Sequence, residues 1–84
     1  MKHAGPAALK ELAPLLQELR TSSPAVTERK PGSFYRKGEA LLHFHEDPAG
    51  LFADLKVAGE WQRYPVSDAA GRARLIKAWN RVAL

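Results

Sequence analysis

Two histidines, His43 and His45, lie two residues apart in the stretch LLHFHEDPAGLF, residues 41–52. Residues at that spacing on a β-strand point to the same side, about 6.5–7 Å apart at their backbones, so both imidazoles can converge on one ion. Asp54, on the strand expected to pair with this one, is a third candidate ligand. A catalytic zinc commonly has three such ligands and one open position. One hypothesis is therefore a divalent-metal site of His43, His45 and Asp54.

Two carboxylates, Glu46 and Asp47, follow the histidines directly. An Asp before Pro-Ala-Gly is typical of the first residue of a turn, because its side chain bonds to the backbone two residues on. The sequence contains no Ser or Cys nucleophile motif and no glycine-rich phosphate loop. We therefore predict no catalytic residues and no cofactor, and the sequence favours a binding protein over an enzyme.

The chain has 84 residues, which fits a single domain over 1–84. It has no cysteine, which excludes a disulfide framework and zinc sites with thiolate ligands. No apolar run approaches the roughly 20 residues of a membrane span, so we expect a cytoplasmic protein with no membrane partner. The net charge of +4 is ordinary for a soluble domain and also favours acidic partners such as nucleic acid.

The elements that would position these residues begin with a helix over residues 5–20. Its apolar stripe consists of Leu9, Leu12, Leu16 and Leu19. Pro14 either kinks this helix or begins its main segment, because proline removes a backbone donor inside a helix. Residues 1–5 are expected to be disordered, and residues 21–32 to form a mobile linker rich in Ser, Thr and Pro.

Residues 33–66 change to a period of two. Turn signals at Lys37-Gly38, Asp47–Gly50 and Ala58-Gly59 divide them into strands at 33–36, 39–46, 51–57 and 60–66. The chain then returns to helix, with Ser67 as the expected N-cap. Gly71 should weaken the first turns of this helix by about 1 kcal/mol relative to Ala.

The result is an α+β fold of order α-β-β-β-β-α. An antiparallel meander sheet should carry the N- and C-terminal helices on one face, as a two-layer sandwich. A four-residue loop would pair Leu42 with Leu55 and Phe44 with Ala53, which buries the apolar set and turns the histidines outward. A three-residue loop would reverse these faces.

In the first register the outer face of the sheet carries an aromatic and charged set. Its members are Phe34, Leu41, His43, His45, Phe52, Asp54, Lys56, Trp61 and Arg63. Asp54 should accept from both His43 and Arg63 across the strands. The main functional hypothesis is a small binding module that uses this face for a protein partner or for self-association. The alternative is nucleic-acid binding through the same basic, aromatic face. The candidate binding residues are His43, His45, Phe52, Asp54, Lys56, Trp61 and Arg63.

The run PGSFYRKGEALLHFHEDPAGLFADLK, residues 31–56, with RYPV at 63–66 and a last helix, resembles small uncharacterised bacterial proteins. That resemblance implies a bacterial protein and assigns no activity. The element order is similar to YjbR-like and frataxin-like α/β sandwiches, an analogy of fold only. It is also similar to the double-stranded-RNA-binding domain, whose last helix begins with lysines where this chain has Asp68, Arg72 and Arg74. Frataxin-like proteins carry an acidic ridge on the first helix, where this chain has only Glu11 and Glu18.

Overall fold

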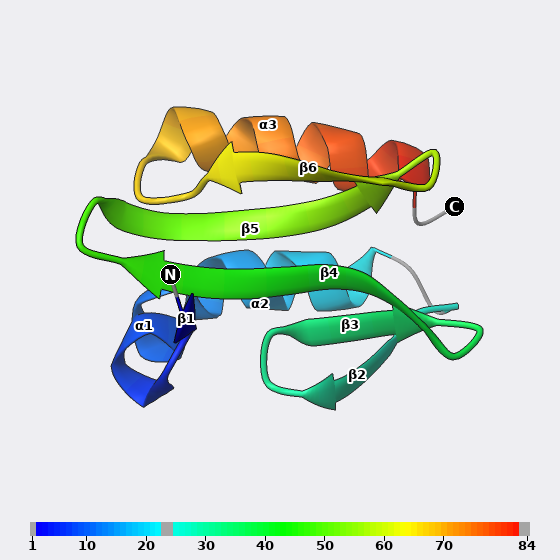
Figure 1. The fold of residues 1–84 in the computed structure, drawn as a ribbon, viewed down its shortest axis with the longest axis horizontal. Coiled ribbons are helices and arrows are strands. Elements are labelled where there is room, and N and C mark those ends of the chain that lie inside the picture. Colours follow the sequence, from blue (N-terminus) through cyan, green and yellow to red (C-terminus); the bar gives the residue numbers. More distant parts are fainter. Residues whose placement is uncertain (1, 23–24, 83–84) are drawn as a thin grey trace.

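A computed structural model describes residues 2–22 and 25–82 and shows an α+β fold with helices toward both ends of the chain (Figure 1). The chain order is β1 (Lys2–His3), α1 (Pro6–Glu11), α2 (Ala13–Thr21), β2 (Thr27–Lys30), β3 (Ser33–Arg36), β4 (Glu39–Asp47), β5 (Gly50–Val57), β6 (Glu60–Pro65) and α3 (Ala69–Val82). The predicted fold class is confirmed.

The strands form one antiparallel sheet of order β2-β3-β4-β5-β6, with β1 attached to β4. Strand β5 occupies one edge of β4 along residues 42–47, so β1 and β3 share the other edge. Strand β3 pairs with the first part of β4, and β1 pairs near its end, at His45 and Glu46. This shared edge is visible in Figure 1, where β1 and β3 lie side by side below β4.

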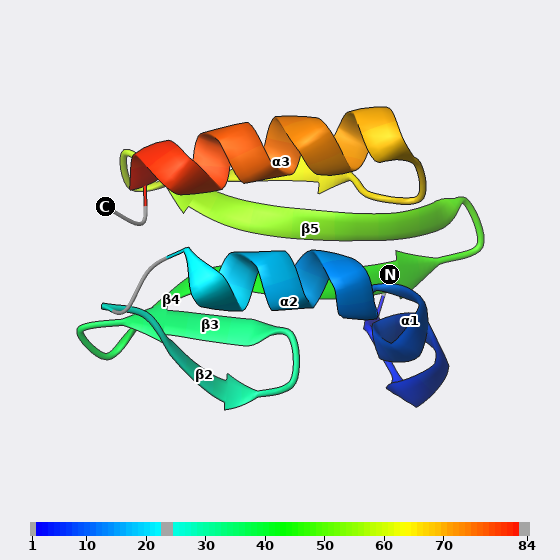
Figure 2. The same cartoon turned by 180° about the vertical axis from the view of Figure 1, so that it is seen from behind.

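The helices α2 and α3 lie together on the back of the sheet and leave its front open (Figures 1 and 2). Apolar side chains from both helices and from the strands fill the space between these layers, as the leucine stripe predicts. The core members are Leu12, Leu15, Leu16, Leu19, Phe34, Leu41, Leu42, Phe44, Ala53, Leu55, Val66, Leu75 and Trp79. The two-layer arrangement with both helices on one face is therefore as expected.

The register of the central hairpin is the predicted one. Leu42 pairs with Leu55 and Phe44 with Ala53, but the ladder continues to Asp47 and Gly50, so the loop has two residues and not the predicted four. Asp47 accepts a hydrogen bond from the Ala49 N–H at 3.0 Å, which is the turn role expected of it. The histidines consequently face away from the helices.

The ends of the helices decide between the two alternatives for Pro14 and correct the predicted N-cap of α3. Pro14 stands in the first turn of α2, so the chain forms two helices joined at Leu12 and not one kinked helix. The side chain of Asp68, and not that of Ser67, caps α3 by accepting from the Gly71 N–H at 2.8 Å. The hydroxyl of Ser67 instead accepts from the Leu51 N–H at 2.9 Å.

Two side chains predicted on the outer face, Phe34 and Leu41, are buried in the core. Phe34 is 2% exposed and packs edge-on against Trp79, with ring centroids 5.4 Å apart. The register of β3 against β4 shifts between Phe34 and Tyr35, so Leu41 is an extra residue in β4. Such a bulge exchanges the faces of the strand beyond it. Tyr35 therefore takes the outer face in place of Phe34, and Leu41 is 7% exposed.

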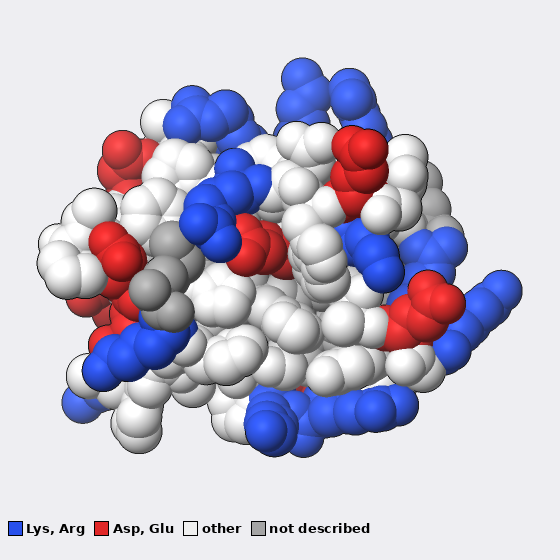
Figure 3. Space-filling model, in the orientation of Figure 1, with Lys and Arg blue, Asp and Glu red and all other residues white. Residues whose placement is uncertain are grey.

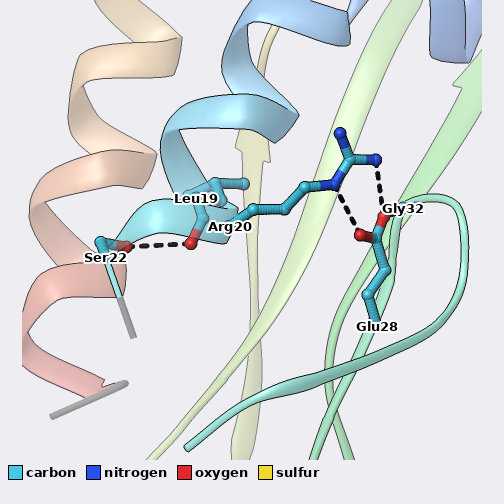
Figure 4. A network of polar contacts seen from close by, with 5 residues as sticks. All are labelled: Leu19, Arg20, Ser22, Glu28 and Gly32. Carbon is cyan, nitrogen blue, oxygen red and sulfur yellow. Dashed lines mark hydrogen bonds and ion pairs between the residues drawn. The ribbon is translucent and has the colours of Figure 1, made fainter. Parts of the chain in front are cut away.

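Two strands lie in segments for which the sequence predicted none. Residues 2–3, within the segment expected to be disordered, form β1, and residues 27–30, within the expected linker, form β2. A bidentate ion pair from Arg20 on α2 to Glu28 anchors β2, with contacts of 2.6 and 2.9 Å (Figure 4). Glu28 also accepts from the Gly32 N–H at 2.9 Å. One carboxylate thus ties the β2–β3 hairpin to the helix layer.

Candidate metal site

The predicted candidate residues lie together on the open face of the sheet. Cross-strand pairs join His43 to Asp54 and His45 to Phe52, and the β5–β6 hairpin adds the pairs Asp54–Arg63 and Lys56–Trp61. Uncharged side chains occupy most of this front face, with charged groups at its centre and rim (Figure 3). Trp61 is 47% exposed. The sheet thus gathers all seven candidates on one surface.

Three imidazoles meet at the shared edge of β4. One ring nitrogen from each of His3, His43 and His45 lies within 4.8 Å of the other two. The chain contains three histidines in all, so every histidine belongs to this cluster. Two nitrogens bound to one tetrahedral zinc lie about 3.3–3.4 Å apart, given Zn–N bonds of 2.0–2.1 Å. Small side-chain rotations would therefore bring the three rings onto one ion.

Backbone pairing and one carboxylate bring His3 to this position. His3 pairs with His45 across the β1–β4 ladder, and the Ala4 N–H donates to the Phe44 carbonyl at 3.0 Å. Glu46 accepts from the Gly5 N–H at 2.6 Å and lies 3.6 Å from the Lys2 ammonium. Glu46, for which the sequence suggested no chemical role, therefore holds the N-terminal segment against β4.

His43 has a nitrogen without a hydrogen-bond partner. Within the described parts of the chain, its Nε2 is the one buried side-chain nitrogen or oxygen that has none. Leaving such an atom unpaired costs about 1–3 kcal/mol, and native proteins rarely do so without a reason such as a bound ion or water. The ring is surrounded by aromatic groups, with Tyr35 at 6.1 Å and Trp61 at 5.6 Å between centroids. A metal ion bound through Nε2 would supply the missing partner.

The carboxylate of Asp54 supports the cluster from the next strand. It was predicted to accept from His43 and Arg63. The predicted contact with Arg63 is confirmed, with two hydrogen bonds at 2.8 and 2.9 Å, but the imidazole next to Asp54 is that of His45, whose Nε2 lies 3.2 Å away. A carboxylate behind a histidine ligand is the usual partner that orients the ring at metal sites. Asp54 therefore contacts one of the three imidazoles from the next strand, and the cluster of ring nitrogens contains His3 in its place.

Burial lowers the pKa of both His43 and His45, and the neighbouring imidazole of His3 lowers each of them further. Asp54 opposes this shift at both histidines. The two hydrogen bonds from Arg63 lower the pKa of Asp54 itself. These shifts favour the neutral, metal-binding form of His43 and His45, next to an ionised Asp54.

A row of aromatic and cationic side chains crosses the same face. The guanidinium carbon of Arg29 lies 4.3 Å from the centroid of Tyr35, and the Lys56 ammonium lies 5.5 Å from that of Trp61. The ring of His43 lies between the two aromatic rings. Cations beside aromatic faces are a common arrangement on surfaces that bind single-stranded nucleic acid.

A cleft opens next to the histidine cluster, where β1 and β3 approach β4 from the same side. Its volume is about 570 Å³, within the range of small-molecule sites. The N-terminal segment, the β2–β3 hairpin and β4 form its walls. The lining residues are His3, Ala4, Leu9, Arg29, Lys30, Pro31, Gly32, Ser33, Tyr35, His43 and Phe44.

Sequence reasoning missed His3, Tyr35 and Arg29. His3 was assigned to a disordered end, because a strand of two residues has no detectable period. Tyr35 reaches the outer face only through the bulge at Leu41. The available signal for His3 was compositional, since two of the three histidines were already candidate ligands.

No protein-family model, curated protein or solved structure matches the chain. The resemblances to small bacterial proteins, to YjbR-like and frataxin-like sandwiches and to the double-stranded-RNA-binding domain therefore stay predictions. None of the helices in the described residues is long and apolar enough to cross a membrane.

Proposed function

We propose that this protein is a small binding module that holds a divalent transition-metal ion on the open face of its sheet. His3, His43 and His45 are the ligands. The observation that carries the proposal is the approach of their ring nitrogens to within 4.8 Å of one another. The ligand set predicted from the sequence changes in one member, with His3 in place of Asp54.

The electrostatics of the cluster support this function. Metal binding needs imidazoles without an added proton, and burial lowers the pKa of His43 and His45 in that direction. His43 and His45 are partly buried, and each would be repelled by a charged neighbouring imidazole if it were protonated. An ion bound through the buried Nε2 of His43 would give that atom a partner.

The chemistry of the ligands indicates the class of metal. Imidazole nitrogen suits zinc, copper, nickel, cobalt and iron(II), whereas magnesium and calcium prefer oxygen ligands. Three protein ligands leave a fourth position of a tetrahedral zinc or cobalt ion open. We therefore expect Zn²⁺ and Co²⁺ to bind and Mg²⁺ and Ca²⁺ not to compete at equal concentration.

Calorimetric titration of the protein without an affinity tag tests the proposal. We expect one Zn²⁺ per chain. Removing a partner behind a metal ligand typically weakens binding about 10- to 100-fold, so His43→Ala or His3→Ala should weaken it by at least about 100-fold. Trp61→Phe, which changes a ring on the same face without removing a ligand atom, is the matched control. Zinc binding that is absent, or equal in all these proteins, would refute the metal function.

A second function, binding of single-stranded nucleic acid, is favoured by the row of Tyr35, His43 and Trp61 with a cation at each end. Stacking on one exposed aromatic ring contributes about 1–3 kcal/mol per base. Anisotropy of a labelled DNA 12-mer at two salt concentrations tests this. Trp61→Ala should weaken binding, and Arg74→Gln, on the helix layer, should not. No complex at low salt would exclude this second function.

A further inference from the structure

We propose that the cleft beside the histidine cluster binds a small anionic ligand through oxygen, a carboxylate or a phosphate monoester, with one oxygen on the metal ion. This inference rests on the metal function proposed above and adds the chemical class of the ligand. It depends on the position of the cleft beside the metal cluster, on the charges of its lining residues, and on the coordination position that three protein ligands leave open on the ion.

The cleft and the metal cluster share two side chains. His3 and His43, two of the three ligands, also line the cleft. An ion held between the three rings would therefore border it. The third ligand, His45, is not among the lining residues and lies against Asp54 on the other side. A ligand entering the cleft would reach the ion from the side opposite that carboxylate.

The walls of the cleft are cationic. Arg29 and Lys30 line it, and no Asp or Glu does. Within the described residues, neither cation has an acidic partner. Arg29 lies over the ring of Tyr35 at 4.3 Å, a contact that uses the face of the guanidinium and leaves its N–H edges available. Those edges match the geometry of carboxylate and phosphate oxygens.

The remaining walls fit a ligand with an apolar part. Leu9 and Phe44 are apolar lining residues, and Ser33 and Tyr35 add hydroxyl groups to the lining. The cleft volume of about 570 Å³ accommodates a ring with one anionic group. A metal ion, Arg29 and Lys30 would together surround the anionic end, while the apolar wall would contact the rest of the molecule.

The test uses protein loaded with Co²⁺, whose visible spectrum reports a change of ligand at the ion. Benzoate and phenyl phosphate are titrated in separate experiments, which distinguishes carboxylate from phosphate recognition. We expect at least one of them to shift the cobalt bands at millimolar concentration or below. The double variant Arg29→Gln/Lys30→Gln should keep the cobalt spectrum and bind the anion about ten-fold or more weakly, because it loses two charge-assisted contacts.

The matched control is Arg74→Gln/Lys77→Gln, which removes the same charge from exposed positions of α3 on the other face of the sheet. It should bind both anions as the wild type does. Cobalt bands that form and do not respond to either anion would overturn the cleft proposal and leave the metal function intact. An equal loss of anion affinity in both double variants would overturn the cleft proposal in the same way. Absence of the cobalt bands would refute both proposals.

Discussion

The two sides of strand β4 differ in regularity. On one side, β5 and β6 form long hairpins with an unbroken register, and Asp54 and Arg63 form a bidentate ion pair. On the other side, β1 and β3 share a single edge, the β3–β4 pairing has a bulge at Leu41 of β4, and His43 Nε2 has no partner in the described structure. The regular side satisfies its polar groups within the chain, and the irregular side presents nitrogen ligands beside a cleft.

The contrast indicates where a small domain can place a binding site. In a continuous ladder the backbone donors and acceptors pair with one another, and the side chains are aligned in fixed rows. An edge divided between two short strands leaves a gap, and here that gap is the cleft lined by His3 and His43. A binding site at this position requires that the core hold the irregular side rigidly.

The largest expected effect is the loss of stability in Trp79→Ala. This variant removes the contact between α3 and β3 on the irregular side. Trp79 packs against Phe34 of β3 and donates from Nε1 to the Ser22 hydroxyl at 2.6 Å. Loss of a buried Trp lowers the free energy of unfolding by about 3–5 kcal/mol. Urea unfolding followed by circular dichroism measures it. Trp79→Phe should cost less, because it retains a ring against Phe34.

The second-largest expected effect is also on stability, at the contact between α3 and β6 on the regular side. A Cβ at Gly71 would lie 1.8 Å from the Pro65 carbonyl oxygen, so Gly71→Ala forces the helix away from the strand. We expect a loss of about 1–3 kcal/mol in the free energy of unfolding, as for other overpacked sites. Helix propensity alone predicts the opposite, a gain of about 1 kcal/mol.

The control for this variant is Ala73→Gly, at an exposed position of the same helix. It should cost about 1 kcal/mol through propensity. A Gly71→Ala protein that is more stable than the wild type would show that the close approach of α3 to Pro65 is not a feature of the folded protein.

The regular side was also the predictable side. Alternation in residues 39–57 and the turn residues Asp47 and Gly50 together determine one register, because only that register buries Leu42 and Phe44. Short-range signals of this kind also give the hairpin at Ala58-Gly59. The candidate residues on β5 and β6 consequently lie where the sequence predicted them.

The irregular side was not predictable from local pattern. Leu41 and Leu42 are both apolar, so alternation does not reveal which of them is the extra residue of the bulge. The strand β2, TERK, has no apolar alternation, and its position depends on an ion pair with Arg20. His3 is placed through Glu46, 41 positions beyond the glycine that it holds. Such contacts depend on the assembled fold.

A smaller effect, on Zn²⁺ affinity, is expected from Glu46→Ala. This variant releases the N-terminal segment and leaves all three histidines in the chain. The Gly5 N–H and the Lys2 ammonium both lose their acceptor. Because His3 would no longer be held near His45, Zn²⁺ affinity should fall about ten-fold, as for other supporting groups. Competition with a chromophoric chelator measures this affinity.

Glu60→Ala is the matched control, since it removes an exposed carboxylate from the β5–β6 hairpin on the regular side. It should leave zinc affinity unchanged. If Glu46→Ala and Glu60→Ala bind zinc equally well, the N-terminal segment does not contribute a ligand, and the difference between the two sides of β4 has no functional meaning.

The smallest expected effect is a change of protein stability with pH. It should arise from His43 and His45 and not from Asp54 and Arg63 on the regular side. Burial lowers the pKa of His43 and His45 in the folded protein. Just below the unfolded-state pKa of about 6.5, the unfolded chain therefore binds protons that the folded protein does not. Metal-free protein should lose stability as the pH falls from about 7.5 through 6.5, and this loss ends only below the folded-state pKa values.

Asp54 does not contribute in this range, because Arg63 lowers its pKa and it stays ionised in both states. Urea unfolding in EDTA at pH 7.5, 6.5 and 5.5 tests the assignment. The variant His43→Gln/His45→Gln should show a shallower decline than the wild type, whereas Arg63→Gln, on the regular side, should retain a decline over the same interval. Equal slopes in the histidine variant and the wild type would mean that other groups set the acid sensitivity, and that the cluster is not held in its neutral, metal-binding form by the fold.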